Sequence, residues 1–358
     1  MKNQISSKAW LVSFFSILLA VVLLAGLTAY RIDPFFQFRY EDGACFNNTA
    51  KFPGPGLVKH YPYDTLILGS SMTQNFDMDL FRKDLGVQPL HIGIGGMGMD
   101  ELLAYIRLSE QVGNCETYYI GMEQYMLTDF HEFRTPEYLF RDDCLSMLRY
   151  LFCYESWFRY LPLDLAVRVL DRLPVTLPDK VQKAMDIDTL GNWEGDFAIG
   201  EDVVIQNYLQ NAYGVSSVET EGLYKDMTER IDFLFENLPG DKSRYHFFFP
   251  PYSVLFWYDA RKDGYMEAYL DAKLYFVEKA REYGTVVYDF QSAECVFDLN
   301  NYKDSTHYCG QINDWMVSCF AAGDYRADRE SVLQSNQKLV QAVDLFSDTY
   351  GMLLNGGK

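Results

Sequence analysis

Three short, mostly apolar runs in the first third of the chain are each closed by a glycine. They are Thr65–Leu68 before Gly69, Val87–Ile94 before Gly95, and Thr117–Ile120 before Gly121. Segments with helical spacing, Asp77–Leu85 and Asp100–Leu108, separate them. Strands that alternate with helices predict parallel βαβ units, because a parallel pair needs a crossover connection. We therefore expect an α/β fold with helices on both sides of a mostly parallel sheet.

The rest of the chain extends this pattern. Two further strands are expected at Arg244–Phe249 and Thr285–Phe290, among helices at Gly222–Glu236, Tyr265–Tyr283, Asp314–Ala322 and Arg329–Tyr350. Residues 135–187 are mostly helical in pattern, with proline breaks, and residues 188–204 have the composition of a loop. We interpret residues 63–350 as one α/β domain, with a mainly helical insertion at about 135–236.

The amino-terminal segment is apolar over Ala9–Tyr30, without a charge. Twenty-two helical residues can cross a bilayer. A cleaved signal peptide is the alternative, with Leu27-Thr28-Ala29 as its exit, but the apolar stretch is long for one. Residues 1–31 therefore read as a cytoplasmic tip with a transmembrane anchor, and residues 32–62 as an extended juxtamembrane linker. Lys2, Lys8 and the amino terminus give a small positive excess over Arg31 and Arg39, which favours an extracytoplasmic domain.

Charge and cysteine content exclude several classes of function. The chain has 31 basic and 50 acidic residues, a net charge of −19, so it repels the phosphate backbone and nucleic acid is not an expected partner. Its seven cysteines form neither a Cys-x-x-Cys pair nor a Cys/His cluster with zinc-like spacing. We expect no metal and no cofactor. The cysteines leave the redox compartment open.

The turn after the first predicted strand carries two serines, Ser70 and Ser71. A serine at the carboxyl end of a parallel strand presents its hydroxyl where open α/β sheets bind ligands. The simpler interpretation is that one of these serines only caps a helix.

A second motif, Asp304-Ser305-Thr306-His307, follows the last predicted strand. A carboxylate three residues before an imidazole can accept its Nδ1 proton, which leaves Nε2 free to take a proton from a serine. A serine hydroxyl needs such a base to become a nucleophile. The order of the motifs, serine early and Asp-x-x-His late, predicts a Ser71–His307–Asp304 triad.

In these motifs the sequence resembles the SGNH/GDSL hydrolase superfamily. Gly69-Ser70-Ser71-Met72-Thr73 stands where that family has Gly-Asp-Ser, with Ser71 in the place of the nucleophile, and Ser70 replaces the aspartate as in membrane-anchored cell-envelope members. The glycine-rich Gly93–Gly98 stands where the family has an oxyanion-binding amide. The resemblance implies that the Gly95 or Gly96 amide shares this role with the amide of Ser71.

One family element is missing. Gly121-Met122-Glu123-Gln124 replaces the family's Gly-x-Asn-Asp, whose asparagine donates to the oxyanion. The amide of Gln124 can substitute for it, whereas Glu123 cannot donate while ionised.

Aromatic residues supply the candidate substrate-binding positions. Tyr252 and Trp257 follow Pro250-Pro251, and Trp193 lies in the inserted loop. Aromatic faces stack on sugars, although core packing explains these residues about as well.

The leading hypothesis is therefore hydrolysis or transfer of an acyl ester on an extracytoplasmic cell-envelope glycan or related polymer. The membrane anchor favours, by analogy, an integral membrane acyl-donor protein as partner. The alternative is a binding or assembly protein of the cell envelope that keeps the fold with little or no turnover.

Overall fold

The computed structural model describes residues 7–41, 47–128, 133–170, 172–174, 176, 178–210 and 220–355. Of the segment 1–31, predicted as cytoplasmic tip and anchor, residues 1–6 lie outside the described range. The chain divides into two compact units, which are described separately. Unit 1 comprises Met1–Asn48, Phe52–Tyr61 and Thr135–Asp186, and unit 2 comprises Thr49–Lys51, Pro62–Arg134 and Ile187–Lys358. The segment predicted as one insertion, about 135–236, is thus divided: residues 135–186 belong to unit 1, and the residues from Ile187 onward belong to unit 2.

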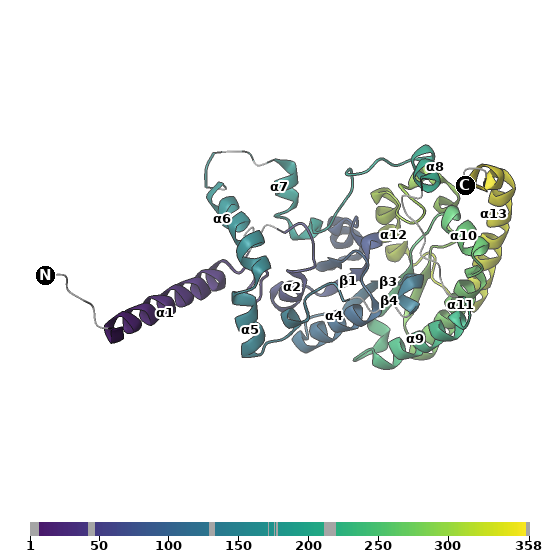
Figure 1. Cartoon of the computed structure of the whole chain (residues 1–358). Coiled ribbons are helices and arrows are strands. Elements are labelled where there is room, and N and C mark those ends of the chain that lie inside the picture. Colours follow the sequence, from purple (N-terminus) through teal and green to yellow (C-terminus); the bar gives the residue numbers. More distant parts are fainter. Residues whose placement is uncertain are drawn as a thin grey trace. The chain divides into compact units, whose positions relative to one another are not determined.

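Unit 2 contains a parallel sheet of five strands, which confirms the predicted α/β class (Figure 1). The strands are β1 (Thr65–Gly69), β2 (Pro89–Gly93), β3 (Thr117–Gly121), β4 (Tyr245–Phe249) and β5 (Val286–Asp289). Their order is β2-β1-β3-β4-β5, and every neighbouring pair is parallel. The order reverses at β1, so the carboxyl ends of β1 and β3 flank the point where such sheets leave a crevice.

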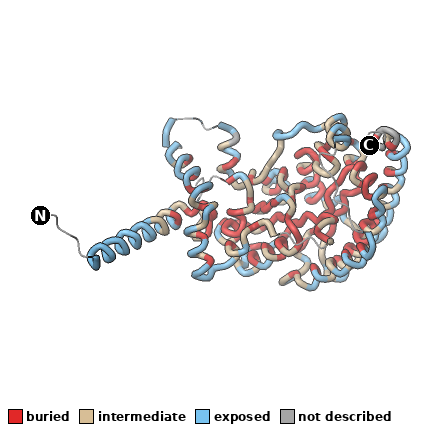
Figure 2. Tube along the Cα trace, in the orientation of Figure 1, coloured by how far each residue is buried: buried red, intermediate tan, exposed pale blue. Residues whose placement is uncertain are grey.

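Helices cover both faces of this sheet. Successive side chains of a strand point to opposite faces, so Phe247 and Phe248 of β4 show what lies on each side. The Phe247 ring contacts Phe235 of α9 (Leu223–Asn237), with centroids 5.8 Å apart. The Phe248 ring lies 5.3 Å from that of Phe320 in α12 (Gly310–Ala322). Both strand residues are fully buried. Figure 2 shows the buried residues concentrated in the interior of this unit. Burial on two faces explains why these strands are nearly continuous hydrophobic runs.

Most helices of unit 2 fall close to their predicted positions, but α8 (Glu201–Leu209) and α10 (Val254–Lys262) were not predicted, and α8 begins inside the segment 188–204 that was predicted as a loop. Asp77–Leu85 is not one helix but a short α-helical turn followed by a π-helical turn, Phe81–Leu85. Helix α12 begins four residues earlier than predicted, because the Glu194 carboxylate accepts a hydrogen bond from the Gly310 amide at 2.6 Å. The other helices are α3 (Met78–Leu80), α4 (Met99–Val112), α8 (Glu201–Leu209), α10 (Val254–Lys262), α11 (Met266–Tyr283) and α13 (Arg329–Asn355).

The regular secondary structure among the described residues of unit 1 is helical. Its helices are α1 (Ser7–Ile32), α2 (Gly54–His60), α5 (Cys144–Leu151), α6 (Leu161–Leu170) and α7 (Asp179–Lys183), with a π-helical turn at Glu155–Tyr160. Helix α1 is long and apolar enough to cross a membrane, and its most apolar window is entirely exposed.

The segment 32–62 is packed and partly helical, so its prediction as an extended linker is wrong. Phe35 and Phe52 are buried and stack with their centroids 5.1 Å apart, against Tyr160 and Tyr150. Gly56 in α2 allows this approach, since a Cβ there would lie 2.1 Å from the Phe35 carbonyl oxygen. The prolines suggested an extended chain, whereas the aromatic partners lie more than a hundred residues away in sequence.

Candidate active site

The turn after β1 orients two serines differently. Ser70 is buried and caps the 3₁₀ turn Ser71–Thr73, its hydroxyl accepting a hydrogen bond from the Met72 amide at 3.2 Å. Ser71 is half-buried. Gly69 is required before them, because a Cβ at this position would lie 2.4 Å from Cγ2 of Thr73. The capping interpretation therefore applies to Ser70, and Ser71 is left available at the end of the strand.

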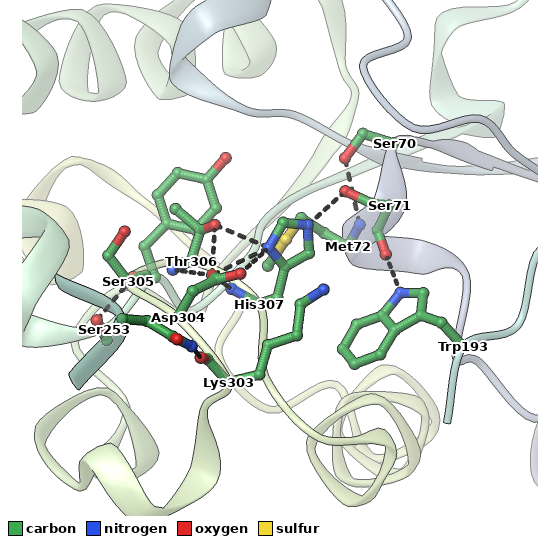
Figure 3. A network of polar contacts seen from close by, with 12 residues as sticks. Ser70, Ser71, Met72, Trp193, Ser253, Lys303, Asp304, Ser305, Thr306 and His307 are labelled. Carbon is green, nitrogen blue, oxygen red and sulfur yellow. Dashed lines mark hydrogen bonds and ion pairs between the residues drawn. The ribbon is translucent and has the colours of Figure 1, made fainter. Parts of the chain in front are cut away.

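Ser71 and His307 are 236 residues apart in sequence and meet in space. Ser71 Oγ lies 2.8 Å from His307 Nε2 (Figure 3). The turn is held from behind, since the Tyr308 hydroxyl and the Asn313 amide each donate to the Met72 carbonyl oxygen at 3.0 Å. Asn313 belongs to α12, so this helix fixes the serine turn beside the histidine loop.

Asp304 lies behind the imidazole. His307 Nδ1 is 2.9 Å from Oδ2 and 3.0 Å from Oδ1 of Asp304. Oδ1 also accepts hydrogen bonds from the amides of Thr306, at 2.9 Å, and His307, at 2.8 Å. Burial disfavours the carboxylate, but hydrogen bonds and charge from His307 and the two amides outweigh it and hold the pKa of Asp304 below its usual value. The carboxylate therefore stays ionised and fixes the tautomer with Nδ1 protonated and Nε2 free.

A cavity of about 280 Å³ opens on this serine. The turns after β1 and β3, the glycine-rich segment after β2 and the histidine loop all contribute to its lining, which includes Ser71, Gly96, Gln124 and His307. Gly96, not Gly95, lines it. A larger surface cavity of about 620 Å³ lies at α11 and the start of β5, around Glu278 and Arg281, and includes neither Ser71 nor His307.

Two backbone amides are candidates for binding an oxyanion here. Those of Ser71 and Gly96 donate no hydrogen bond to any residue that the structure describes. Gly96 has a φ of +72°, a conformation that favours glycine. Gly96 and Ser71 both line the cavity.

Gln124 also faces this cavity. Its side chain is buried, and neither Nε2 nor Oε1 has a hydrogen-bond partner within the described part of the chain. An unpaired buried amide costs roughly 1–3 kcal/mol, so a bound polar group would relieve an existing penalty. Nε2 of Gln124 is thus available as a hydrogen-bond donor, as predicted from the motif in which this chain lacks an asparagine.

Glu123 forms a buried network that the sequence analysis did not foresee. Its carboxylate accepts hydrogen bonds from the hydroxyls of Ser70 and Tyr252. Burial raises the pKa of Glu123, and these two hydrogen bonds only partly oppose the shift. Ser70 and Glu123 are 53 residues apart in sequence, and the parallel register of β1 and β3 brings their turns together. The network joins the turns after β1 and β3.

The three predicted substrate-binding aromatics have different surroundings. Tyr252 lines the cavity. Trp193 lies beside the catalytic histidine candidate, its ring centroid 5.8 Å from that of His307, and its Nε1 donates to the Ser71 carbonyl oxygen at 3.2 Å. Trp257 is fully buried and packs on Phe256, so it is a core residue and the prediction for it is wrong.

Lys303 lies near Asp304 and His307. Lys303 Nζ is 4.7 Å from the ring centroid of Trp193, which Figure 3 shows beside it. Nζ is 3.8 Å from the ring centroid of Phe197. Burial lowers the pKa of Lys303, and the nearby Asp304 carboxylate opposes this. The two rings and the ammonium group form a polar and aromatic border beside His307.

A scan against protein-family models finds no match for this chain, and a search of curated proteins finds no significant match either. Membership of a family therefore remains a prediction from the motifs.

Proposed function

We propose that this protein is a serine esterase or O-acyltransferase that acts on an ester of a cell-envelope glycan or related polymer. The observation that carries the proposal is the 2.8 Å contact between Ser71 Oγ and His307 Nε2, with Asp304 at Nδ1. This arrangement supplies a nucleophile, a base and an orienting carboxylate in the geometry that acyl transfer requires.

The reaction begins as Ser71 Oγ attacks the ester carbonyl carbon while His307 Nε2 takes the hydroxyl proton. The negative charge that develops on the carbonyl oxygen is stabilised by the amides of Ser71 and Gly96 and by Gln124 Nε2. The tetrahedral intermediate collapses, His307 protonates the departing alcohol, and an acyl-Ser71 ester remains. Water or a sugar hydroxyl then gives its proton to His307 and attacks the acyl carbon. His307 returns that proton to Ser71 Oγ as the bond between Oγ and the acyl carbon breaks.

The family and the location belong to the same proposal. The chain resembles an SGNH/GDSL hydrolase with a three-layer α/β/α fold, which the strand order and the helices on both sheet faces support. Helix α1 serves as the membrane anchor, and the site lies on the extracytoplasmic side, where an integral membrane acyl donor would meet it. The aromatic lining, with Tyr125, Tyr252 and Tyr269, suits a sugar substrate.

Hydrolysis of p-nitrophenyl acetate by the full chain in detergent micelles tests the chemistry. Ser71→Ala should abolish it, while Ser318→Ala, an exposed serine on α12, should leave it unchanged. Activity that survives in a folded Ser71→Ala protein would end the proposal. A soluble sugar acceptor added to the wild type distinguishes the two reactions, because a transferase yields the sugar ester at the expense of free acetate.

A further inference from the structure

The helical part of unit 1 exposes several large apolar side chains. We call six of them the outer face; they lie on α5, at or just before the following π-helical turn, and on α6: Leu145, Leu148, Tyr154, Phe158, Leu165 and Val169. Phe152, Leu163 and Leu170 are exposed as well. Leu145, Tyr154 and Phe158 each expose more than 70% of their surface, at 77%, 71% and 74%. Soluble proteins rarely expose so many neighbouring apolar side chains without a partner.

The same helices also have an apolar inner side. Tyr150, Tyr160, Leu161 and Val167 are buried, together with the polar Ser146, Ser156 and Asp164. A surface helix of a water-soluble protein normally has polar residues on the side opposite its buried apolar stripe. Apolar residues on both sides indicate that the outer face has an apolar surrounding.

The outer face adjoins the helix that can cross a membrane. Helices α5 and α6 pack against α1 at its carboxyl end, as Figure 1 shows. A Cβ at Gly26 would lie 3.3 Å from the Phe152 ring, next to the outer face. The first 18 residues of α1, Ser7–Leu24, are exposed (Figure 2). They measure about 27 Å at about 1.5 Å per residue, close to the roughly 30 Å of a hydrocarbon core. The boundary of a bilayer crossed by α1 would thus fall near Gly26, at the level of α5 and α6.

Charge is distributed accordingly. Unit 1 contains 12 basic and 11 acidic residues, which leaves 19 basic and 39 acidic residues in unit 2. An anionic lipid surface would repel unit 2 but not unit 1. Arg149 and Arg159 are exposed among the apolar residues of the outer face, where long guanidinium side chains can reach lipid phosphates while their stems lie on the acyl boundary.

From these observations we infer that the outer face is a membrane-docking surface, embedded in the lipid interface beside α1. Its occupant is the bilayer itself, not a protein. The aromatic pair Tyr154 and Phe158, whose rings stack with centroids 5.2 Å apart, lies at headgroup depth, and the leucines of α5 and α6 lie at the acyl boundary. The anchor of this chain is therefore a transmembrane helix, α1, together with the interfacial helices α5 and α6, which fix the orientation of unit 1 at the membrane. This inference is independent of the proposed catalysis.

Depth-resolved fluorescence quenching tests the inference on the full chain. The environment-sensitive fluorophore NBD is attached to Phe158→Cys or Leu165→Cys in a Cys144→Ser background, since Cys144 is exposed. The protein is reconstituted into phosphatidylcholine and phosphatidylglycerol vesicles that carry nitroxides either near the top or near the end of the acyl chain. Leu18→Cys in α1 is the deep control, and the exposed Glu229→Cys in α9 is the control for an aqueous position. The parent without an added cysteine measures background labelling, and thermal unfolding checks that each labelled chain is folded.

Both outer-face labels should emit at shorter wavelength than the label at Glu229. Shallow nitroxides should quench the outer-face labels at least about twofold more strongly than they quench the label at Glu229. The Leu18 label should respond most to the deep nitroxides. Emission typical of water without quenching, at both outer-face positions, would overturn the inference. So would blue-shifted labels that no lipid nitroxide quenches and that respond to the protein-to-lipid ratio, because a second copy would then cover the face.

Discussion

Replacing Asp304 with asparagine should remove the base from the active site while it preserves the shape of the side chain. Oδ1 of Asp304 accepts hydrogen bonds from two backbone amides, so the carbonyl oxygen of an asparagine must occupy that position. Its NH₂ group then replaces Oδ2, 2.9 Å from His307 Nδ1. A donor there disfavours a proton on Nδ1, which retains only the oxygen 3.0 Å away as an acceptor, and it favours the tautomer with the proton on Nε2. Nε2 can then no longer take the proton of Ser71.

The expected loss follows from this change of tautomer. General-base catalysis contributes about 10²–10⁴-fold, so kcat should fall by that factor, which corresponds to about 3–5.5 kcal/mol of barrier. The assay is p-nitrophenyl acetate hydrolysis by the wild type and by Asp304→Asn. The stability effect has a defined sign, because the pKa of Asp304 is lowered in the folded protein. Its contribution is present above the usual value of 3.8 and is lost as the pH falls through the folded pKa, so the two proteins should converge in acid.

Asp298→Asn is the matched control. Asp298 is exposed in the same loop and caps a 3₁₀ turn through the Asn300 amide at 3.0 Å, without contact to His307. Its replacement should leave kcat within about twofold of the wild type. A folded Asp304→Asn protein with kcat close to that of Asp298→Asn would refute the assignment of Asp304 and the tautomer argument.

Other variants examine the rest of the site. Gln124→Ala should lower kcat by about 10²–10³-fold with little loss in the free energy of unfolding, since this amide has no hydrogen-bond partner among the described residues. Unchanged kcat in steady-state kinetics would remove Gln124 from the oxyanion site. Because the pKa of Glu123 is raised above its usual 4.5, wild-type stability relative to Glu123→Gln should decrease as the pH rises through the folded pKa. Urea unfolding between about pH 4 and about pH 8 measures this, and a difference that does not vary with pH contradicts it. Trp193→Phe keeps an aromatic ring but removes the donor to the Ser71 carbonyl oxygen, and kcat/KM should fall by the equivalent of about 1 kcal/mol. A larger fall in kcat/KM that comes only from a rise in KM would indicate that Trp193 binds substrate instead.

The fold class was predictable because its signals are local. Each strand of the sheet is a short apolar run, and burial on both faces makes such runs easy to recognise. The segment before β1 was mispredicted for the opposite reason. Pro34, Pro53 and Pro55 suggest an extended chain, whereas the burial of Phe35 and Phe52 depends on aromatic partners from residues 135–186. No local pattern reveals such a partnership.

The candidate site shows the same limit. The order of the Ser71 turn and the Asp304–His307 motif predicted which chemical groups could cooperate, and the structure brings these three side chains together. The roles of the aromatics could not be predicted, because Tyr252 and Trp257 are only five residues apart, yet one lines the cavity and the other packs in the core. Pairing of Ser70 with Glu123 required the parallel register of β1 and β3, which sets the turns after them side by side.

Labelling with a fluorophosphonate probe, followed by peptide mass spectrometry, tests the central claim most directly. The account predicts that the probe forms a covalent phosphonyl ester on Ser71 Oγ in the wild type, and that labelling is lost in His307→Ala while Ser70 stays unmodified. A folded wild-type protein that the probe does not label, or labels at a different serine, would contradict the account and would favour a binding or assembly role for this site.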